Sequence, residues 1–165
     1  MKEIWYLLKC PEGNEADYVK KYQEAAAPDR EDKTDEAGSR QAIYFQYQRM
    51  MRYRGRWHLE KRAVLPGYIF LSGRETAAWK RQMPISLKPC ETPFLKNLCP
   101  EGDVVGMSRG IIKNGIPVVT SGPLQGKEYL IRKIDRHKRT AEIEIPLEGR
   151  KQRVTVGLEI YEKQI

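Results

Sequence analysis

The spacing of hydrophobic and polar residues predicts short strands and a helix at the start of the chain. Residues Ile4–Cys10 are mostly apolar, which indicates a strand buried on both faces near the middle of its sheet. Apolar residues then recur at helical spacing until Pro28, so we expect a helix over Glu15–Ala27. The polar segment Asp29–Arg40 has no periodicity and is expected to form a mobile loop.

A hairpin with a basic tip is expected next. Apolar positions alternate with polar ones over Gln41–Tyr47, the pair Arg54-Gly55 is a turn signal, and Trp57–Ala63 provides the returning strand. After Pro66-Gly67, the apolar run Tyr68–Leu71 predicts a short buried strand.

The pattern changes at Pro100. Two helices are expected before it. The first spans Glu75–Met83, and the second has Thr92 as its N-cap, begins at Pro93 and ends at about Leu98. After it, short β-branched runs alternate with turn signals about every ten residues, of which Asn114-Gly115 is the strongest. This rhythm is typical of a small antiparallel barrel. Its expected strands are Ile111-Ile112, Ile116–Thr120, Tyr129–Ile134, Ala141–Ile145 and Arg153–Gly157.

The expected fold is therefore an α+β domain over residues 1–100, a linker over 101–108 and an all-β barrel over 109–165. The longest apolar runs fall far short of the roughly 20 residues that cross a bilayer, so no transmembrane helix is expected. The first residues lack the apolar region of a signal peptide, and we expect a cytoplasmic protein.

The cysteine and histidine residues indicate no metal site. Cys10, Cys90 and Cys99 cannot all pair within one chain, which favours a reducing compartment. His58 and His137 stand at no familiar metal-ligand spacing from them, and nothing suggests a catalytic thiol–imidazole pair. A Walker-type phosphate loop is also absent. We therefore expect no cofactor, no metal and no enzymatic activity.

The positive charge is unevenly distributed. The chain has 30 Lys and Arg against 22 Asp and Glu, a net charge of +8. Glu12–Glu36 holds nine acidic and four basic residues, whereas Arg40–Arg62 holds seven basic residues and one acidic residue. Arg132–Arg139 holds five basic residues and one acidic residue. The last two segments should attract a polyanion.

Nucleic acid is the polyanion that these segments suit best. Cations neutralise phosphates, and the aromatic residues between the arginines of the second segment can stack on bases. The alternative is that the arginines form only the solvated face of a soluble hairpin. The candidate nucleic-acid-binding residues are Arg49, Arg52, Arg54, Arg56, Lys61 and Arg62 in the hairpin and Arg136, Lys138 and Arg139 in a barrel loop.

Three motifs, in their order along the chain, resemble one family. They are Trp5–Leu8, Leu65–Phe70 and Val118–Gly126. Together they resemble the NusG family of bacterial transcription elongation factors, and the resemblance covers nearly the whole chain. It implies an N-terminal NusG-type domain, with helices flanking an antiparallel sheet, and a C-terminal KOW domain with an SH3-like barrel.

The resemblance also implies a partner and a set of contact residues. In this family the N-terminal domain docks on RNA polymerase through an apolar depression and suppresses pausing. The residues that the resemblance places in or next to the docking region are Trp5, Tyr6, Pro66, Gly67, Tyr68 and Phe70. The alternative is that the aromatic residues among them belong to the core.

Within the family, Met107-Ser108, Gly126–Glu128 and Arg136–Arg139 look most like a specialised paralogue, the LoaP-type processive antiterminator. We therefore expect a monomeric antitermination factor that binds RNA polymerase, does not bind membranes, and is recruited by an element such as an RNA hairpin or an exposed DNA strand. Two alternatives remain. One is a general housekeeping elongation factor, and the other is a ribosome-associated KOW-type RNA-binding module.

Overall fold

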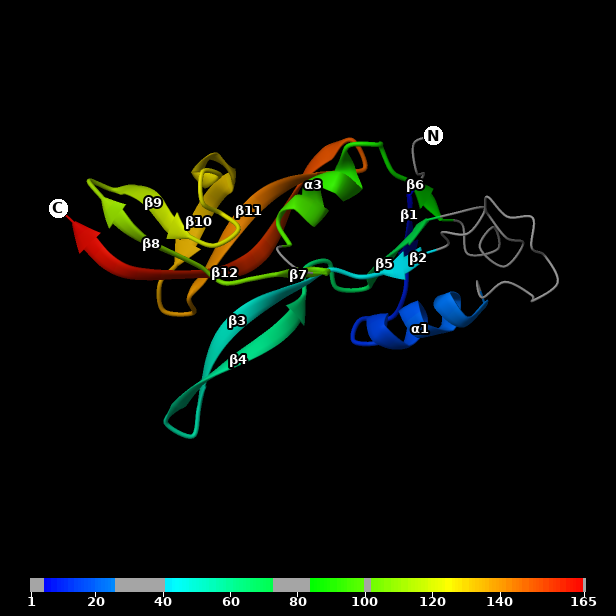
Figure 1. The fold of residues 1–165 in the computed structure, drawn as a ribbon, viewed down its shortest axis with the longest axis horizontal. Coiled ribbons are helices and arrows are strands. Elements are labelled where there is room, and N and C mark those ends of the chain that lie inside the picture. Colours follow the sequence, from blue (N-terminus) through cyan, green and yellow to red (C-terminus); the bar gives the residue numbers. More distant parts are fainter. Residues whose placement is uncertain (1–4, 26–40, 73–83, 100–101, 165) are drawn as a thin grey trace. The chain divides into compact units, whose positions relative to one another are not determined.

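The structure is a computed structural model that describes residues 5–25, 41–72, 84–99 and 102–164 (Figure 1). These residues are mostly β, with two α-helices. The chain divides into two compact units, Met1–Tyr44 with Leu65–Thr92, and Phe45–Val64 with Pro93–Ile165. The predicted loop Asp29–Arg40 and the predicted helix Glu75–Met83 lie outside the described residues.

The first unit contains a four-stranded antiparallel sheet in the order β2-β5-β1-β6. Its strands are β1 (Trp5–Lys9), β2 (Gln41–Ile43), β5 (Tyr68–Ser72) and β6 (Ile85–Ser86). β1 lies inside the sheet, as its apolar sequence predicts. Helix α1 (Glu15–Ala25) buries Tyr22 against Leu8, Ala42 and Ile69, which form the core of this unit.

The second unit begins with a hairpin. β3 (Gln46–Tyr53) pairs with β4 (Arg56–Ala63), and the short strand β7 (Val104–Val105) runs parallel to β3. The single strand predicted over Gln41–Tyr47 is wrong, because β2 ends at Ile43 and pairs in the first unit. The alternation of apolar residues continues through the break, so periodicity alone does not reveal that the pairing partner changes.

A five-stranded sheet completes the second unit, in the order β10-β11-β12-β8-β9. Its strands are β8 (Ser108–Lys113), β9 (Ile116–Ser121), β10 (Ile131–Asp135), β11 (Thr140–Leu147) and β12 (Arg150–Gln164), with the 3-10 helix η1 (Glu128–Leu130) before β10. Its buried side chains include Ile143, Ile145, Val156 and Leu158. Alternation along β11 places these isoleucines inside and Glu142 and Glu144 on the outer face.

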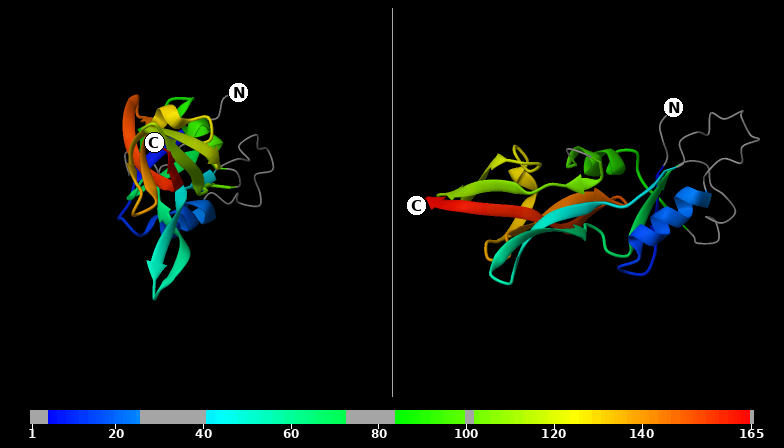
Figure 2. Two further views of the ribbon diagram at one scale, coloured as in Figure 1. Left: turned by 90° about the vertical axis from the view of Figure 1, so that its left-hand side faces the viewer. Right: turned by 60° about the horizontal axis from the view of Figure 1, so that its bottom comes forward.

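The long strand β12 corrects the expected barrel topology. Its first half pairs antiparallel with β11, and its second half pairs in parallel with β8, so the expectation of a wholly antiparallel barrel is wrong at this pair (Figure 2). The predicted strand Arg153–Gly157 covers only the first of these pairings. Hydrophobic alternation predicts a strand but does not specify the direction of its neighbour.

Two further predictions concern chain boundaries. Helix α3 begins at Glu91 and ends at Asn97, so Thr92 is not its N-cap, and the Thr92 hydroxyl is buried without a hydrogen-bond partner among the described residues.

The division into residues 1–100, 101–108 and 109–165 stays a prediction, while residues 45–64 of the hairpin group with the strands of the second unit. No helix in the described part of the chain is long and apolar enough to cross a membrane.

β12 crosses β3 at Gly157, where the two backbones come unusually close. A Cβ atom added at Gly157 would overlap the carbonyl oxygen of Gln48 on β3 and the sulfur of Met107. The Met107 N–H also donates a hydrogen bond to Gln48 Oε1 at 3.2 Å. The absence of a side chain at Gly157 therefore lets the hairpin pack against β12.

We predict that Gly157→Ala lowers the free energy of unfolding by about 1–3 kcal/mol, the usual cost of an overpacked contact. In a strand without such a contact, alanine in place of glycine would instead stabilise the protein by roughly 0.5–1 kcal/mol. Urea unfolding measures the change, with Gln152→Ala on the exposed face of β12 as the control. A more stable Gly157→Ala variant would contradict the close packing.

Candidate nucleic-acid interface

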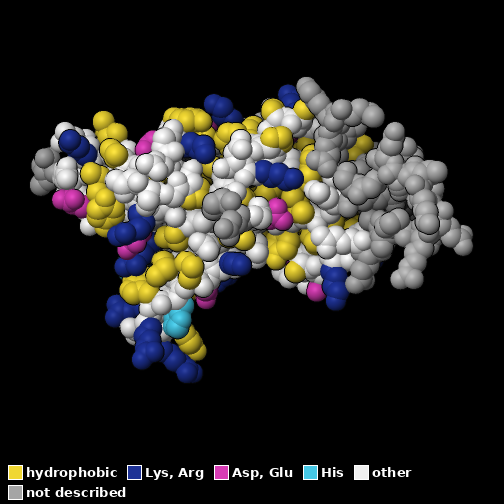
Figure 3. Space-filling view, in the orientation of Figure 1, with side chains coloured by type: hydrophobic (Ala, Val, Ile, Leu, Met, Phe, Trp, Pro, Cys, Tyr) yellow, Lys and Arg dark blue, Asp and Glu magenta, His cyan; other side chains and the backbone are white. Residues whose placement is uncertain are grey.

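The β3–β4 hairpin presents its arginines at an exposed tip. Arg54 and Gly55 have φ values of 51° and 74°, which suit the two-residue turn that matches the twist of paired strands. The turn places Arg52 opposite Trp57 and Tyr53 opposite Arg56. The arginines at the tip are exposed, and Lys and Arg side chains gather on this projecting part of the molecule (Figure 3).

The second basic cluster is the turn between β10 and β11, residues 136–139. The Lys138 N–H donates a hydrogen bond to Asp135 Oδ1 at 2.9 Å, and this bond lowers the pKa of the Asp135 carboxyl. Arg139 closes the turn with a φ of 56°, in the left-handed region. The turn leaves the side chains of Arg136, His137 and Lys138 exposed.

The structure brings parts of the two basic clusters together in the second unit. A hollow of about 470 Å³, here called the Trp57 hollow, is lined from both sides. Its residues are Arg49, Met50, Met51, Arg52 and Trp57 from the hairpin and Arg136, His137, Lys138 and Arg139 from the turn. Residues more than 80 positions apart in sequence thus share one surface.

Arg139 connects the turn to the hairpin directly. Its guanidinium lies 3.7 Å from the centre of the Trp57 ring, a cation–π contact. The same guanidinium forms an ion pair with Glu159 of β12 at 3.4 Å. Arg139 is therefore held from two sides, and its charge is partly neutralised before any ligand arrives.

The other cations of the Trp57 hollow keep their charge available. Arg52, Arg136 and Lys138 form no ion pair with a described residue, whereas Arg132 and Arg153 of the sheet pair with Glu144. An anion in the hollow would therefore meet cations that form no ion pair with a described residue, whereas Arg132 and Arg153 are compensated by acids of the sheet.

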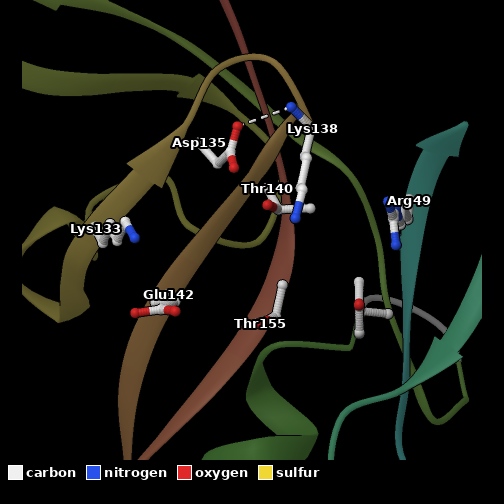
Figure 4. A pocket seen from close by; sticks show the side chains of 8 residues that line it. Arg49, Lys133, Asp135, Lys138, Thr140, Glu142 and Thr155 are labelled. Carbon is white, nitrogen blue, oxygen red and sulfur yellow. Dashed lines mark hydrogen bonds between the residues drawn. The ribbon is translucent and has the colours of Figure 1, made fainter.

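A smaller and more polar hollow of about 280 Å³ adjoins these residues and is here called the Thr140 hollow (Figure 4). It is lined by Tyr47, Arg49, Lys133, Asp135, Lys138, Thr140, Glu142 and Thr155. Arg49 and Lys138 thus line both hollows. The Nε of Arg49 is buried and has no hydrogen-bond partner among the described residues, although Glu60 stands opposite it on β4.

The remaining predicted residues do not line the Trp57 hollow. Arg54 stacks over the Tyr53 ring at 5.2 Å, and Arg56 is exposed at the hairpin tip. Lys61 is exposed farther along β4, and Arg62 pairs with Glu60 at 3.4 Å. The charge pattern did not single out Met50 and Met51, because apolar residues within a basic run give no charge signal.

The residues predicted to contact RNA polymerase lie in the first unit and differ in exposure. Trp5 and Phe70 are buried, at 6% and 0% exposure, so their side chains support the sheet from inside. Tyr6 and Tyr68 are half-buried and Pro66 is exposed. Only the last three offer side-chain surface to a partner.

Glu15 holds the turn that contains Pro66 and Gly67. Its buried carboxylate accepts hydrogen bonds from the Gly67 N–H at 2.8 Å and from the Gly13 N–H at 3.3 Å. Burial by itself raises the pKa of Glu15, but these backbone hydrogen bonds outweigh it and lower the pKa below its ordinary value. Gly67 has a φ of 84°, and its carbonyl accepts a hydrogen bond from Cys10 N–H at 2.8 Å.

The three thiols form no disulfide and differ in exposure. Cys10 is buried, Cys99 is half-buried and Cys90 is exposed. Burial is the main cause that raises the pKa of Cys99 to about 12, and the negative charge of Asp103 adds to it. Burial also raises the pKa of Cys10, and the negative charge of Glu15 adds to that effect. These two thiols are protonated at neutral pH. Within the described ranges, no group of three or more His, Cys, Asp or Glu residues could hold a metal ion.

The chain resembles a solved structure but matches no family model. No protein-family model matches the chain, and no curated protein matches it. A solved structure of Thermotoga maritima NusG, which concerns domain interaction in that protein, is 17% identical over 95% of this chain and 94% of its own, with a TM-score of 0.42. At that TM-score the likeness supports no inference about fold or function.

We predict that Glu15→Gln lowers the free energy of unfolding at pH 7 by about 1–2 kcal/mol, because two backbone N–H groups lose a charged acceptor. The lowered pKa means that the ionised carboxylate stabilises the fold above pH 4.5, the ordinary value for this group, and that this contribution is lost as the pH falls through the folded-state value. The stability difference between wild type and variant should therefore shrink in acid.

Urea titrations at several pH values measure this difference. Asp17 lies in the same helix turn and is exposed, so Asp17→Asn serves as the control. It should change the free energy of unfolding by less than about 0.5 kcal/mol. A difference between wild type and Glu15→Gln that does not depend on pH would contradict the assigned role of the carboxylate.

Proposed function

We propose that the chain is a NusG-type transcription elongation factor of the antiterminating, LoaP-like kind. Its second unit binds nucleic acid through the Trp57 hollow and the hairpin tip, and its first unit docks on RNA polymerase through the region of Tyr6, Pro66 and Tyr68. The protein acts as a monomer in the cytoplasm and catalyses no reaction itself.

The observation that supports nucleic-acid binding is the convergence of two basic segments on one surface. Arg52 on the hairpin and Arg136 and Lys138 on the turn line the same hollow, and none of them pairs with a described acid. If the arginines served solubility alone, they would not need to meet across 80 residues of sequence. Phosphate groups spaced along a strand are the natural counterpart of such a surface.

The transcription half of the proposal is supported by the three ordered motifs and by the local structure of the second one. Pro66 and Gly67 form a turn whose backbone is fixed by Glu15, so the neighbouring Tyr68 has a defined position. A rigid turn beside half-buried aromatic residues is the kind of surface that serves as a protein-interface anchor.

We predict that the double variant Arg52→Glu/Arg136→Glu weakens binding of a single-stranded RNA at least 30-fold at physiological salt, because two phosphate contacts are lost and replaced by repulsion. The slope of log K against log salt should fall by about 1.4, or about 0.7 for each contact with a single strand. Fluorescence anisotropy over a salt series measures both quantities.

Arg150→Glu is the matched control. This residue is exposed at the β11–β12 turn, outside both hollows, and a second charge change can be made at the exposed Lys151, which forms no ion pair with a described residue. The control should bind RNA within about threefold of wild type, since only long-range charge has changed. If the control substitutions lowered the RNA affinity as much as Arg52→Glu/Arg136→Glu does, binding would depend on net charge and not on this surface.

The transcription role is tested with purified bacterial RNA polymerase and a template that contains a terminator. Addition of the protein should raise readthrough, and the effect should depend on a leader RNA that the protein binds. Readthrough that ignores the leader would favour a general elongation factor. Copurification with ribosomal subunits and not with the polymerase would favour the ribosome-associated alternative.

A further inference from the structure

The Trp57 hollow contains an apolar surface that phosphate binding does not require. Met50, Met51 and Trp57 line it beside the cations, and Trp57 is 42% exposed. An exposed aromatic ring beside cations offers a flat ligand both a stacking surface and nearby positive charge. Its volume of about 470 Å³ lies within the roughly 300–1,000 Å³ of pockets that enclose small ligands.

Trp57 is held in place before any ligand binds. The Arg139 guanidinium stacks on the ring at 3.7 Å, and Arg139 is fixed in turn by Glu159 at 3.4 Å. This arrangement covers part of the ring and limits its rotation, while 42% of the residue stays exposed. A flat ligand could therefore stack on the remaining surface without first ordering the side chain.

The adjoining Thr140 hollow supplies the anion-binding groups. Arg49 and Lys138 line both hollows, and the buried Arg49 Nε is a donor without a hydrogen-bond partner among the described residues. Two acids face the same hollow, and nearby cations offset their charges, Lys138 that of Asp135 and Arg153 that of Glu142. Asp135 accepts the Lys138 N–H at 2.9 Å, and Glu142 pairs with Arg153 at 3.6 Å.

We propose that the two hollows together bind one unpaired nucleotide of an RNA or DNA strand. Its base stacks against Trp57 and the two methionines, and its phosphate lies at Arg49 and Lys138. The inference rests on the proposed nucleic-acid binding and makes it more specific. A duplex cannot supply this ligand, because the faces of its bases are stacked on one another inside the helix.

Four probes test this inference by fluorescence anisotropy. They are a strand of about ten deoxythymidines, the same length of uridines, an abasic deoxyribose-phosphate strand, and the thymidine strand paired with its complement; the length follows the usual site sizes of such proteins. Trp57→Leu should weaken binding of the two base-containing strands about tenfold. It should change binding of the abasic strand and of the duplex less than twofold.

Two further variants separate the role of the ring from a general effect on folding. Trp57→Phe keeps a flat ring and should recover most of the lost affinity. Tyr129→Leu removes an aromatic residue that is 66% exposed but lies outside both hollows, and it should bind all four probes like wild type.

Each outcome of this experiment is informative. A similar loss on the intact and abasic strands, or no rescue by phenylalanine, would overturn the nucleotide site while leaving nucleic-acid binding in place. Failure of the wild-type protein to bind any of the four probes would instead overturn the proposed function on which the inference rests. Loss on uridines alone or on thymidines alone would support the site, and a strand of deoxyuridines would then separate a preference for the sugar from one for the thymine methyl group.

Discussion

At Gly157 the backbone of β12 approaches the carbonyl of Gln48 on β3 so closely that no side chain fits between them. This contact packs the hairpin against the five-stranded sheet of the second unit. Arg49 and Arg52 of the hairpin then share one hollow with the β10–β11 turn, and Arg139 can stack on Trp57. Without that packing, the two basic segments would be separate patches.

Ion pairs on the sheet also distinguish the cations around the Trp57 hollow from other basic residues. Glu159 pairs with Arg109 and Arg139, and Glu144 pairs with Arg132 and Arg153, so two acids of β11 and β12 partly compensate four arginines. The net charge of +8 describes the chain but not its surface. The uncompensated cations that matter for a ligand are those around the Trp57 hollow, where apolar side chains lie between them. This mixture of unpaired charge and exposed ring distinguishes a strand-binding surface from a merely soluble one.

Much of the local structure follows from the sequence. The first strand, helix α1, the two hairpin turns and most strands of the second unit were predictable from periodicity and from Arg54-Gly55 and Asn114-Gly115, whereas β7 lies in the segment predicted as a linker. The break after Ile43 and the parallel pairing of β12 with β8 were not. In both places the residues alternate as in any strand, and the difference lies in which distant strand is the neighbour. The convergence of the two basic clusters was missed for the same reason, since it depends on a contact at Gly157 that has no signature along the chain.

The exposed fractions of the aromatic residues were only partly predictable from the sequence. Trp5 lies in an apolar run and is buried in the first unit, whereas Trp57 lies among polar and charged residues and is 42% exposed beside cations. Burial is decided by what packs on the face of the strand, and periodicity gives only the face.

The most direct test of this account is an NMR measurement of the nuclear Overhauser effect between the Trp57 ring and the Arg139 side chain. The structure places the guanidinium carbon 3.7 Å from the ring centre, so a cross-peak is expected in the absence of ligand. Its absence, in spectra that show the expected contacts within the β3–β4 hairpin and within the β10–β11 turn, would mean that the two basic segments do not form one surface.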